Sequence, residues 1–355
     1  MSKIVFETDR SDESHRIPEN LVFGRTFTTH MLEMNYSASK GGWQDAVIKK
    51  QSNISLSPAA LVLHYGQAIF EGLKAYKHAD GKISLFRPRK NFERLNRSAE
   101  RMCIPQIDID FVMESLMELI KLDKAWIPEK PGYSLYIRPF VFATDALLGV
   151  KPGDEYKFII LLSPVGPYYP QGFKPVPILV TDKYVRAVRG GVGDCKTAGN
   201  YAASLHAQQE AQKLGFTQVL YLDALQQKYI EEVGTMNIFA QFKNEVATPR
   251  LSGTILPGIT RMSVLEILKD WGYNVSERDI ALQEIINNYN NGNLIELFGT
   301  GTAAVISSIS KLKYNDIEIH FSEEHAGELG TKLYKELTGI QYGEIEDKYN
   351  WNVII

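Results

Sequence analysis

A stretch rich in proline and glycine near the middle of the chain most limits the folds that this sequence can adopt. Between positions 164 and 177 it contains Pro164, Gly166, Pro167, Pro170, Gly172, Pro175 and Pro177. Such crowding interrupts helices and strands and is typical of a linker. The 355 residues are enough for two domains that each bury a core. We therefore predict a smaller N-terminal domain over 1–169, a linker over 170–180 and a larger C-terminal domain over 181–355.

The residue pattern predicts helices and strands on both sides of this linker. Residues 61–86 are expected to be extended or turning, with a hairpin that turns at Ala79-Asp80-Gly81. Apolar residues at helical spacing predict helices over 91–102, 111–126, 200–214 and 259–271. Runs rich in β-branched and aromatic residues predict strands over 133–143, 156–163, 178–181, 217–223, 228–234, 236–242 and 294–299.

Charge and cysteine content exclude several classes of protein. The net charge of -3 offers no basic field for a polyanion, so nucleic acid is not an expected partner. Cys103 and Cys195 are too few for a disulfide framework or a thiolate zinc site, so we expect no metal and a cytoplasmic location. The N-terminus lacks the apolar core of a secretory signal. No apolar run reaches the ~20 residues that span a bilayer, so no membrane partner is expected.

The segment GDCKTAGNYAAS, residues 193–204, places Lys196 among glycine, alanine and small polar residues. A lysine in such a bend is ordinarily a solvated surface charge. Small neighbours also leave room for a flat ring beside a lysine that acts as a Schiff-base nucleophile. Tyr201, at the start of the helix predicted to follow, would hydrogen-bond a phenolate on that ring, or else is an ordinary packed aromatic residue.

A second group of motifs lies downstream, in EVGTMNIF (232–239), VAT (246–248) and ILPGITR (255–261). The residue types and spacing resemble the signature of the fold-type IV pyridoxal-phosphate enzymes. The similarity continues through LVFGRTFTTHML, HYGQAIFEGLKAY, FRPRKNFERLNRSAERM, SLYIRP and FGTGTAAV. Over nearly its whole length the chain resembles a branched-chain amino acid aminotransferase of the longer subgroup. The resemblance implies a two-domain α/β (α+β type) fold with the active site at the domain interface.

The resemblance implies pyridoxal 5'-phosphate as the cofactor and Lys196 as the catalytic lysine that binds it. Tyr201 is implied as a further cofactor ligand. Glu232 would keep the ring nitrogen protonated, so that the ring withdraws electrons. The alternative for Glu232 is a solubilising charge at a strand edge.

The cofactor phosphate is expected to bind where Pro257-Gly258 precedes a predicted helix, at the amides of Ile259 and Thr260. Pro-Gly also simply begins helices, which is the plainer explanation of this stretch. The resemblance adds Arg94 and Thr302 as phosphate ligands. Arg94 would otherwise be a surface cation on its helix.

The resemblance further implies a substrate pocket for branched side chains. Its residues would be Phe23, Tyr65, Phe70, Tyr136, Tyr168, Thr235 and Ala303, with Leu148 and Val150 supplied by the second subunit of a homodimer. Each aromatic residue could instead pack in a core. Arg138, with Tyr65, would bind the distal carboxylate of 2-oxoglutarate, unless it forms a structural ion pair.

The implied reaction is the reversible transfer of the amino group of L-leucine, L-isoleucine or L-valine to 2-oxoglutarate, which yields the branched-chain 2-oxo acid and L-glutamate. Lys196 would act as both base and acid. A D-amino acid aminotransferase or an aminodeoxychorismate lyase of the same fold would share Lys196 and Glu232. A dinucleotide-binding or other non-catalytic protein would not need this pair, and FGTGTA lacks the full G-x-G-x-x-G pattern. Ala304 and Ser307 replace the Cys-x-x-Cys pair of some animal members, which excludes thiol regulation there.

Overall fold

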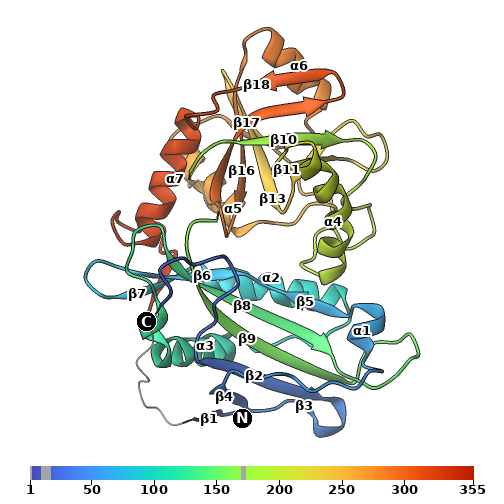
Figure 1. The fold of residues 1–355 in the computed structure, drawn as a ribbon, viewed down its shortest axis with the longest axis vertical. Coiled ribbons are helices and arrows are strands. Elements are labelled where there is room, and N and C mark those ends of the chain that lie inside the picture. Colours follow the sequence, from blue (N-terminus) through green and yellow to red (C-terminus); the bar gives the residue numbers. More distant parts are fainter. Residues whose placement is uncertain (1, 9–16, 169–172) are drawn as a thin grey trace. The chain divides into compact units, whose positions relative to one another are not determined.

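The computed structural model describes residues 2–8, 17–168 and 173–355. The chain forms two compact units, each with its own sheet and core (Figure 1). Unit 1 comprises Met1–Tyr168, Cys195–Ala198 and Gly339–Ile355, and unit 2 comprises Tyr169–Asp194 and Gly199–Thr338. Among the described residues, no helix is both long and apolar enough to cross a membrane.

Unit 1 is built on a mainly antiparallel sheet whose order is β1-β4-β2-β9-β8-β6-β7-β19, with β3 paired to β2 and β5 to β8. The strands are β1 (Ile4–Glu7), β2 (His30–Ser37), β3 (Gly42–Trp43), β4 (Ala46–Lys50), β5 (Ala68–Phe70), β6 (Leu73–Lys77), β7 (Ile83–Phe86), β8 (Ser134–Ala143), β9 (Glu155–Val165) and β19 (Asn352–Ile354). The helices are α1 (Leu61–Tyr65), α2 (Pro88–Arg101) and α3 (Ile109–Leu122), with 3-10 turns at Ala38–Lys40 and Lys124–Trp126.

Helices α2 and α3 form as the apolar spacing predicts. Phe92 and Leu95 of α2 are buried in one core with Leu116 of α3 and with the apolar residues of the sheet. Asp108 caps α3, because its carboxylate accepts hydrogen bonds from the amides of Asp110 (3.0 Å) and Phe111 (3.2 Å). The buried residues of α2 also include three polar ones, an asparagine, an arginine and a serine, which take part in the contacts described below.

Unit 2 contains a sheet that closes on itself. Its order is β12-β11-β10-β17-β16-β13-β14-β15, with β18 on β17 and an additional pairing of β12 with β13. The strands are β10 (Val176–Thr181), β11 (Gln218–Leu222), β12 (Ile230–Val233), β13 (Met236–Phe242), β14 (Glu245–Pro249), β15 (Val275–Arg278), β16 (Leu294–Gly301), β17 (Val305–Tyr314) and β18 (Ile317–His320). Because β12 pairs with both β11 and β13, the six strands β10, β11, β12, β13, β16 and β17 form a ring.

The helices of unit 2 are α4 (Ala198–Lys213), α5 (Ile259–Asp270), α6 (Leu282–Asn290) and α7 (Glu328–Gln341). The first turn of α7 is held by a buried acid from the sheet. Glu296 of β16 accepts hydrogen bonds from the amides of Leu329 (2.8 Å) and Gly330 (3.3 Å). Burial raises the pKa of Glu296 to about 7, although these two amides act in the opposite direction.

The structure corrects three of the sequence-based expectations. Residues 339–355 belong to unit 1 and not to the predicted C-terminal domain, because β19 pairs antiparallel with β7 and Trp351 packs on Phe86 with ring centroids 5.5 Å apart. Of the predicted linker over 170–180, residues 170–172 lie outside the described residues, and most of its second half forms β10 (Val176–Thr181). In the stretch expected to be extended, Leu61–Tyr65 forms the helix α1.

Candidate active site

The segment that carries Lys196 is fixed to unit 1 on both sides of its backbone. The Lys196 amide donates to Ser98 Oγ of α2 (3.0 Å), and its carbonyl accepts from the Phe70 amide of β5 (3.0 Å). Thr197 forms a bridge to Ile69. The half-buried side chain places Nζ 4.7 Å from the centre of the Phe70 ring. A freely solvated lysine is therefore wrong as an interpretation, because the main chain is immobilised and the amine lies over a ring.

Arg94 of α2 belongs to a buried pair that the sequence did not reveal. Its guanidinium donates from Nε to Glu71 Oε1 (2.6 Å) and from Nη2 to Glu71 Oε2 (2.9 Å). Asn91 Nδ2 also donates to Glu71 Oε2 (2.9 Å). Burial alone would raise the pKa of Glu71, but Arg94, Lys196 and Asn91 together hold it below its usual value. Arg94 is thus not a surface cation, and its role as a phosphate ligand stays a prediction.

Five of the residues predicted for the substrate pocket contact one another in unit 1. Phe23 packs against Tyr136 and Tyr168, with ring centroids 4.8 and 5.8 Å apart. Arg138 donates from Nη2 to Tyr136 Oη (2.9 Å) and lies over the Phe70 ring at 4.8 Å. Its buried Nε has no hydrogen-bond partner among the described residues. The cluster therefore combines an aromatic wall with a cation that has a spare donor, as a carboxylate ligand would require.

One glycine allows the tyrosine of this cluster to take its position. A Cβ atom at Gly72 would lie 2.1 Å from Tyr136 Oη, closer than any real contact. Tyr65 lies on the surface of unit 1, where its Oη donates to the Leu148 carbonyl. Leu148 and Val150 are 64% and 83% exposed. The structure thus joins Tyr65 to Leu148, one of the two residues predicted to serve a second subunit.

Glu232 is buried in unit 2, on β12, and has three donors. Arg186 Nη1 lies 2.7 Å from its Oε2, the Leu256 amide donates to the same oxygen (3.2 Å), and Asn237 Nδ2 donates to Oε1 (3.2 Å). Because Glu232 is only 2% exposed, a solubilising charge at a strand edge is wrong as an interpretation. Asn237 was part of the recognised motif, whereas Arg186 carried no signal because it lies 46 positions before Glu232.

The remaining predicted residues of unit 2 gather at one end of its ring of strands. Val233 pairs with Met236 across the turn that holds Thr235, and Gly301 pairs with Val305 across the turn that holds Thr302 and Ala303. Asn237 pairs with Thr300 between β13 and β16, which brings both turns to the same end.

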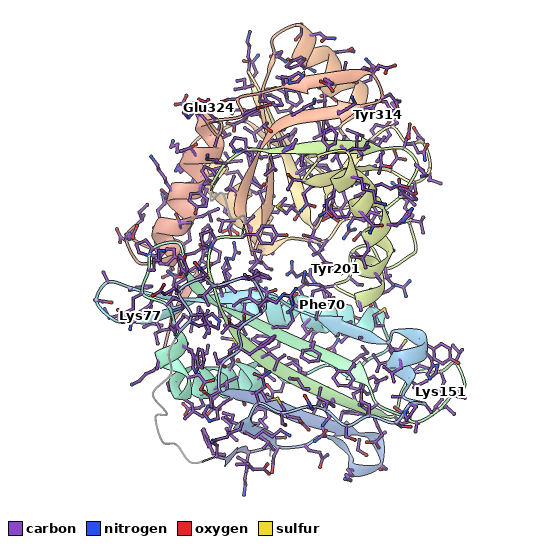
Figure 2. The ribbon with its side chains drawn as sticks, in the orientation of Figure 1. Phe70, Lys77, Lys151, Tyr201, Tyr314 and Glu324 are labelled. Carbon is purple, nitrogen blue, oxygen red and sulfur yellow. The ribbon has the colours of Figure 1, made fainter. Side chains whose placement is uncertain are left out.

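Helix α5 begins beside these strands, since a Cβ atom at its N-cap Gly258 would lie 2.1 Å from Asn237 Oδ1. No side chain caps α5, so the amides at Ile259 and Thr260 start the helix without that partner. Tyr201 projects from the first turn of α4 (Figure 2). Gly258 is needed at the start of α5 because only a residue without a side chain fits against Asn237.

Comparisons with known proteins identify the family of the chain. Residues 68–312 match the family model described as amino-transferase class IV. The chain therefore belongs to the class IV aminotransferases. Within them it belongs to the branched-chain-amino-acid aminotransferases: it is 54% identical to branched-chain-amino-acid aminotransferase 2 of Bacillus subtilis (strain 168), over 94% of this chain and 92% of that protein.

More distant relatives extend the agreement. The branched-chain-amino-acid aminotransferase of Mycolicibacterium smegmatis is 45% identical, over 97% of this chain and 94% of that protein. The solved branched-chain amino acid aminotransferase of Escherichia coli is 27% identical with a TM-score of 0.75, over 86% of this chain and 95% of that chain. That of Thermobaculum terrenum, solved in its PLP form, shares the fold at 20% identity with a TM-score of 0.74, over 93% and 99% of the two chains. The predicted two-domain fold and family are thereby confirmed.

Proposed function

We propose that the protein transfers the amino group of L-leucine, L-isoleucine or L-valine to 2-oxoglutarate, with pyridoxal 5'-phosphate as its cofactor. The observation that carries this proposal is the fixed backbone of Lys196, whose amine lies over Phe70 in a half-buried setting. The identity of 54% to a branched-chain-amino-acid aminotransferase supports the same choice of substrates.

The donors present in the chain suit this cofactor. The α5 amides at Ile259 and Thr260 lack a side-chain cap, as expected for amides that bind a phosphate. Glu232, whose contacts are Arg186, Asn237 and the Leu256 amide, is a carboxylate that suits a protonated ring nitrogen. When bound, the cofactor supplies an electron-withdrawing ring that stabilises the negative charge left by loss of the α-proton.

The chain's own residues would then handle binding and proton transfer. Lys196 Nζ would take the α-proton from the amino acid and later return it. This role requires a side chain long enough to reach the substrate on a backbone whose position is fixed. Arg138 would hold the distal carboxylate of 2-oxoglutarate through its spare Nε donor. The aromatic wall of Phe23, Tyr136 and Tyr168 would bind the branched side chain and exclude water.

An absorbance spectrum of the purified protein before and after addition of L-leucine tests this proposal. We expect the visible band of the aldehyde cofactor to fall and the band of its amine form to rise. D-alanine should give no such change. A protein that stays colourless with added pyridoxal 5'-phosphate, or that responds only to D-alanine, would contradict the proposal.

Replacement of the lysine tests its role directly. Lys196→Ala should lower turnover by ~10³-fold or more, because proton transfer by a positioned side chain contributes about 10²- to 10⁴-fold and Schiff-base formation is lost as well. Lys77→Ala is the matched control, since Lys77 is a lysine of unit 1 that pairs with Glu129 at the surface. Turnover that survives in Lys196→Ala would remove the lysine from the mechanism.

A homodimer in the cytoplasm completes the proposal. The exposed Leu148, which contacts Tyr65, and the exposed Val150 suit residues that are covered by a second copy of the chain. Val150→Asp should shift the mass measured by sedimentation velocity from two chains toward one. A mass of one chain for the unchanged protein would contradict the dimer, and activity confined to a membrane fraction of the source cells would contradict the location.

A further inference from the structure

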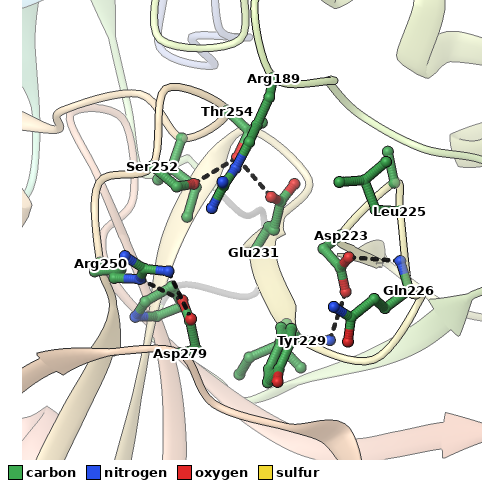
Figure 3. Close-up of a pocket in the computed structure, with 14 residues that line it drawn as sticks. Arg189, Asp223, Leu225, Gln226, Tyr229, Glu231, Arg250, Ser252, Thr254 and Asp279 are labelled. Atoms are coloured by element: carbon green, nitrogen blue, oxygen red, sulfur yellow. Dashed lines mark hydrogen bonds and ion pairs between the residues drawn. The ribbon is translucent and has the colours of Figure 1, made fainter.

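Unit 2 contains a cavity of about 230 Å³ beside strand β12 (Figure 3). Its polar lining includes Arg189, Asp223, Glu231, Arg250, Thr254 and Asp279. None of the residues predicted for the cofactor or the substrate lines it. The cavity is therefore a feature of unit 2 that the proposed aminotransferase activity does not use.

One oxygen of a buried carboxylate in this cavity lacks a hydrogen-bond partner among the described residues. Glu231 is 6% exposed, and its Oε1 accepts a hydrogen bond from Thr254 Oγ1 (2.5 Å). Its Oε2 has no hydrogen-bond partner among the described residues. Figure 3 shows the Glu231 carboxylate between Arg189 and Leu225, with one oxygen joined to Thr254. A buried acceptor without a donor costs free energy, so this oxygen favours a ligand that donates to it.

The other charges of the cavity leave one cation without a partner. The carboxylate of Asp223 accepts from the backbone amides at 226, 228 and 229, each at 2.8 Å. Arg250 forms two hydrogen bonds with Asp279, at 2.7 and 2.8 Å. Arg189 is exposed and forms no ion pair with any described residue. The groups that remain for a ligand are the Arg189 guanidinium and the carboxyl group of Glu231, whose pKa is raised by burial although Thr254, Arg186 and Arg189 act in the opposite direction.

We propose that this cavity binds a small α-amino acid in its zwitterionic form. The ammonium group of the ligand donates to Glu231 Oε2, and its carboxylate binds the Arg189 guanidinium. A bare metal ion fits less well, because no group of three or more His, Cys, Asp or Glu side chains in the described chain is arranged to hold one. The volume of about 230 Å³ suits a ligand of few atoms.

The site is connected to Glu232 through hydrogen bonds within unit 2. The Thr254 carbonyl accepts from Arg186 Nη1 (2.7 Å), and the same nitrogen lies 2.7 Å from Glu232 Oε2. A ligand that binds Glu231 therefore contacts the chain neighbour of Glu232, and Thr254 is linked to Glu232 by two contacts through Arg186. The binding site itself does not depend on the proposed function, since none of its residues takes part in that reaction.

Equilibrium dialysis of the holoenzyme against labelled 2-aminoisobutyrate tests the site. This amino acid has no α-proton and so is not consumed by transamination. We expect a component of one molecule per chain that weakens about tenfold or more in Glu231→Gln and in Arg189→Ala, the effect of losing one charge-assisted hydrogen bond. Glu210→Gln, which changes an exposed glutamate of α4 paired with Lys183, should leave binding unchanged.

Two truncated probes separate the charges. Isobutyrate lacks the ammonium group and isopropylamine lacks the carboxylate, so each should bind at least about tenfold more weakly than 2-aminoisobutyrate. Equal binding by the unchanged protein and both variants would overturn the proposal, as would isopropylamine that binds as tightly as the amino acid. Arg189→Ala alters an exposed side chain and keeps the test valid if Glu231→Gln fails to fold. The spectral response to L-leucine, measured on the same variants, reports separately on the aminotransferase site.

Discussion

Two buried glutamates, one in each unit, have opposite electrostatic character. Glu71 of unit 1 is 0% exposed and Glu296 of unit 2 is 4% exposed. Glu71 is bound by the Arg94 guanidinium, and its pKa is lowered. Among the described residues, the hydrogen bonds to Glu296 come from two backbone amides of α7, and burial raises its pKa to about 7. The difference shows that the nearby cation, and not the degree of burial, sets the charge of a buried acid here.

The two acids should therefore make stability depend on pH in opposite directions. Glu71 has a folded-state pKa below that of the unfolded chain, so its contribution is present above pH 4.5 and is lost as the pH falls through its lowered pKa. Glu296 has a raised pKa, so its contribution is present below pH 4.5 and is lost as the pH rises through about 7.

Arg94→Ala should remove the difference between the two acids, because it leaves Glu71 buried without its arginine partner, as Glu296 already is. We expect the free energy of unfolding of the cofactor-free protein to fall by about 3–5 kcal/mol at pH 7. The loss should be smaller at pH 5, where Glu71 would then take up a proton. Urea unfolding followed by tryptophan fluorescence measures both values. Arg89→Ala, which removes an exposed cation of the same helix, should cost less than ~1 kcal/mol, and equal costs for the two variants would contradict the argument.

Glu296→Gln tests the contribution of the second acid to the pH dependence of stability. The unchanged protein should lose on the order of 3 kcal/mol of unfolding free energy between about pH 4 and pH 8, as Glu296 ionises. The glutamine carbonyl still accepts from the α7 amides but does not ionise, so the variant should gain stability relative to the unchanged protein as the pH rises. Parallel pH profiles for the two proteins would show that Glu296 does not titrate in this range.

Gly327→Ala tests the steric part of the Glu296 site. A Cβ atom at Gly327 would lie 1.9 Å from Glu296 Oε2, so we expect a loss of ~1–3 kcal/mol in the free energy of unfolding. In a Glu296→Ala background the same change should cost much less, because the clashing atom is gone. A double-mutant cycle measures this coupling, and additive effects would rule out the predicted clash.

The smallest effect on the free energy of unfolding is expected for an ion pair that is exposed to solvent. Glu93 pairs with Lys90 on the exposed face of α2 at 2.8 Å. Glu93→Gln should change the free energy of unfolding by less than ~0.5 kcal/mol, because solvent screens the pair. The same urea titration measures it, and a loss comparable to that of Arg94→Ala would mean that burial is not what makes the Glu71 pair matter.

Local structure could be predicted from the sequence where the decisive residues are neighbours. The turn at Ala79-Asp80-Gly81 joins β6 to β7 as expected, with Gly81 at φ +85° and Asp80 Oδ1 accepting from the Lys82 amide. The predicted helix over 200–214 is confirmed as α4, and Gly215, at φ +85°, follows it. In these cases the conformation is set by the spacing of apolar residues and by glycines, which tolerate a positive φ.

Contacts between residues far apart in the chain could not be predicted, because the local residue pattern does not indicate which distant residue is the partner. β19 joins β7 across more than 260 positions, and Arg186 reaches Glu232 from another loop. Glu231 and Glu232 are neighbours on β12, and although neighbouring side chains of a strand point to opposite faces, both are buried. Both are enclosed because β12 belongs to a closed ring of strands, which is a property of the whole of unit 2.

Neither unit is a continuous piece of the chain, and this limits how the protein can be divided. A fragment that stops at residue 168 would lack both Lys196 and the edge strand β19. A fragment that begins after residue 180 would lack β10, a member of the ring of unit 2, and would carry a lysine segment without the helix and strand that fix its backbone. Limited proteolysis at a single point should therefore never yield an independently folded half, and the gene for this enzyme is poorly suited to exchange of either half as a block.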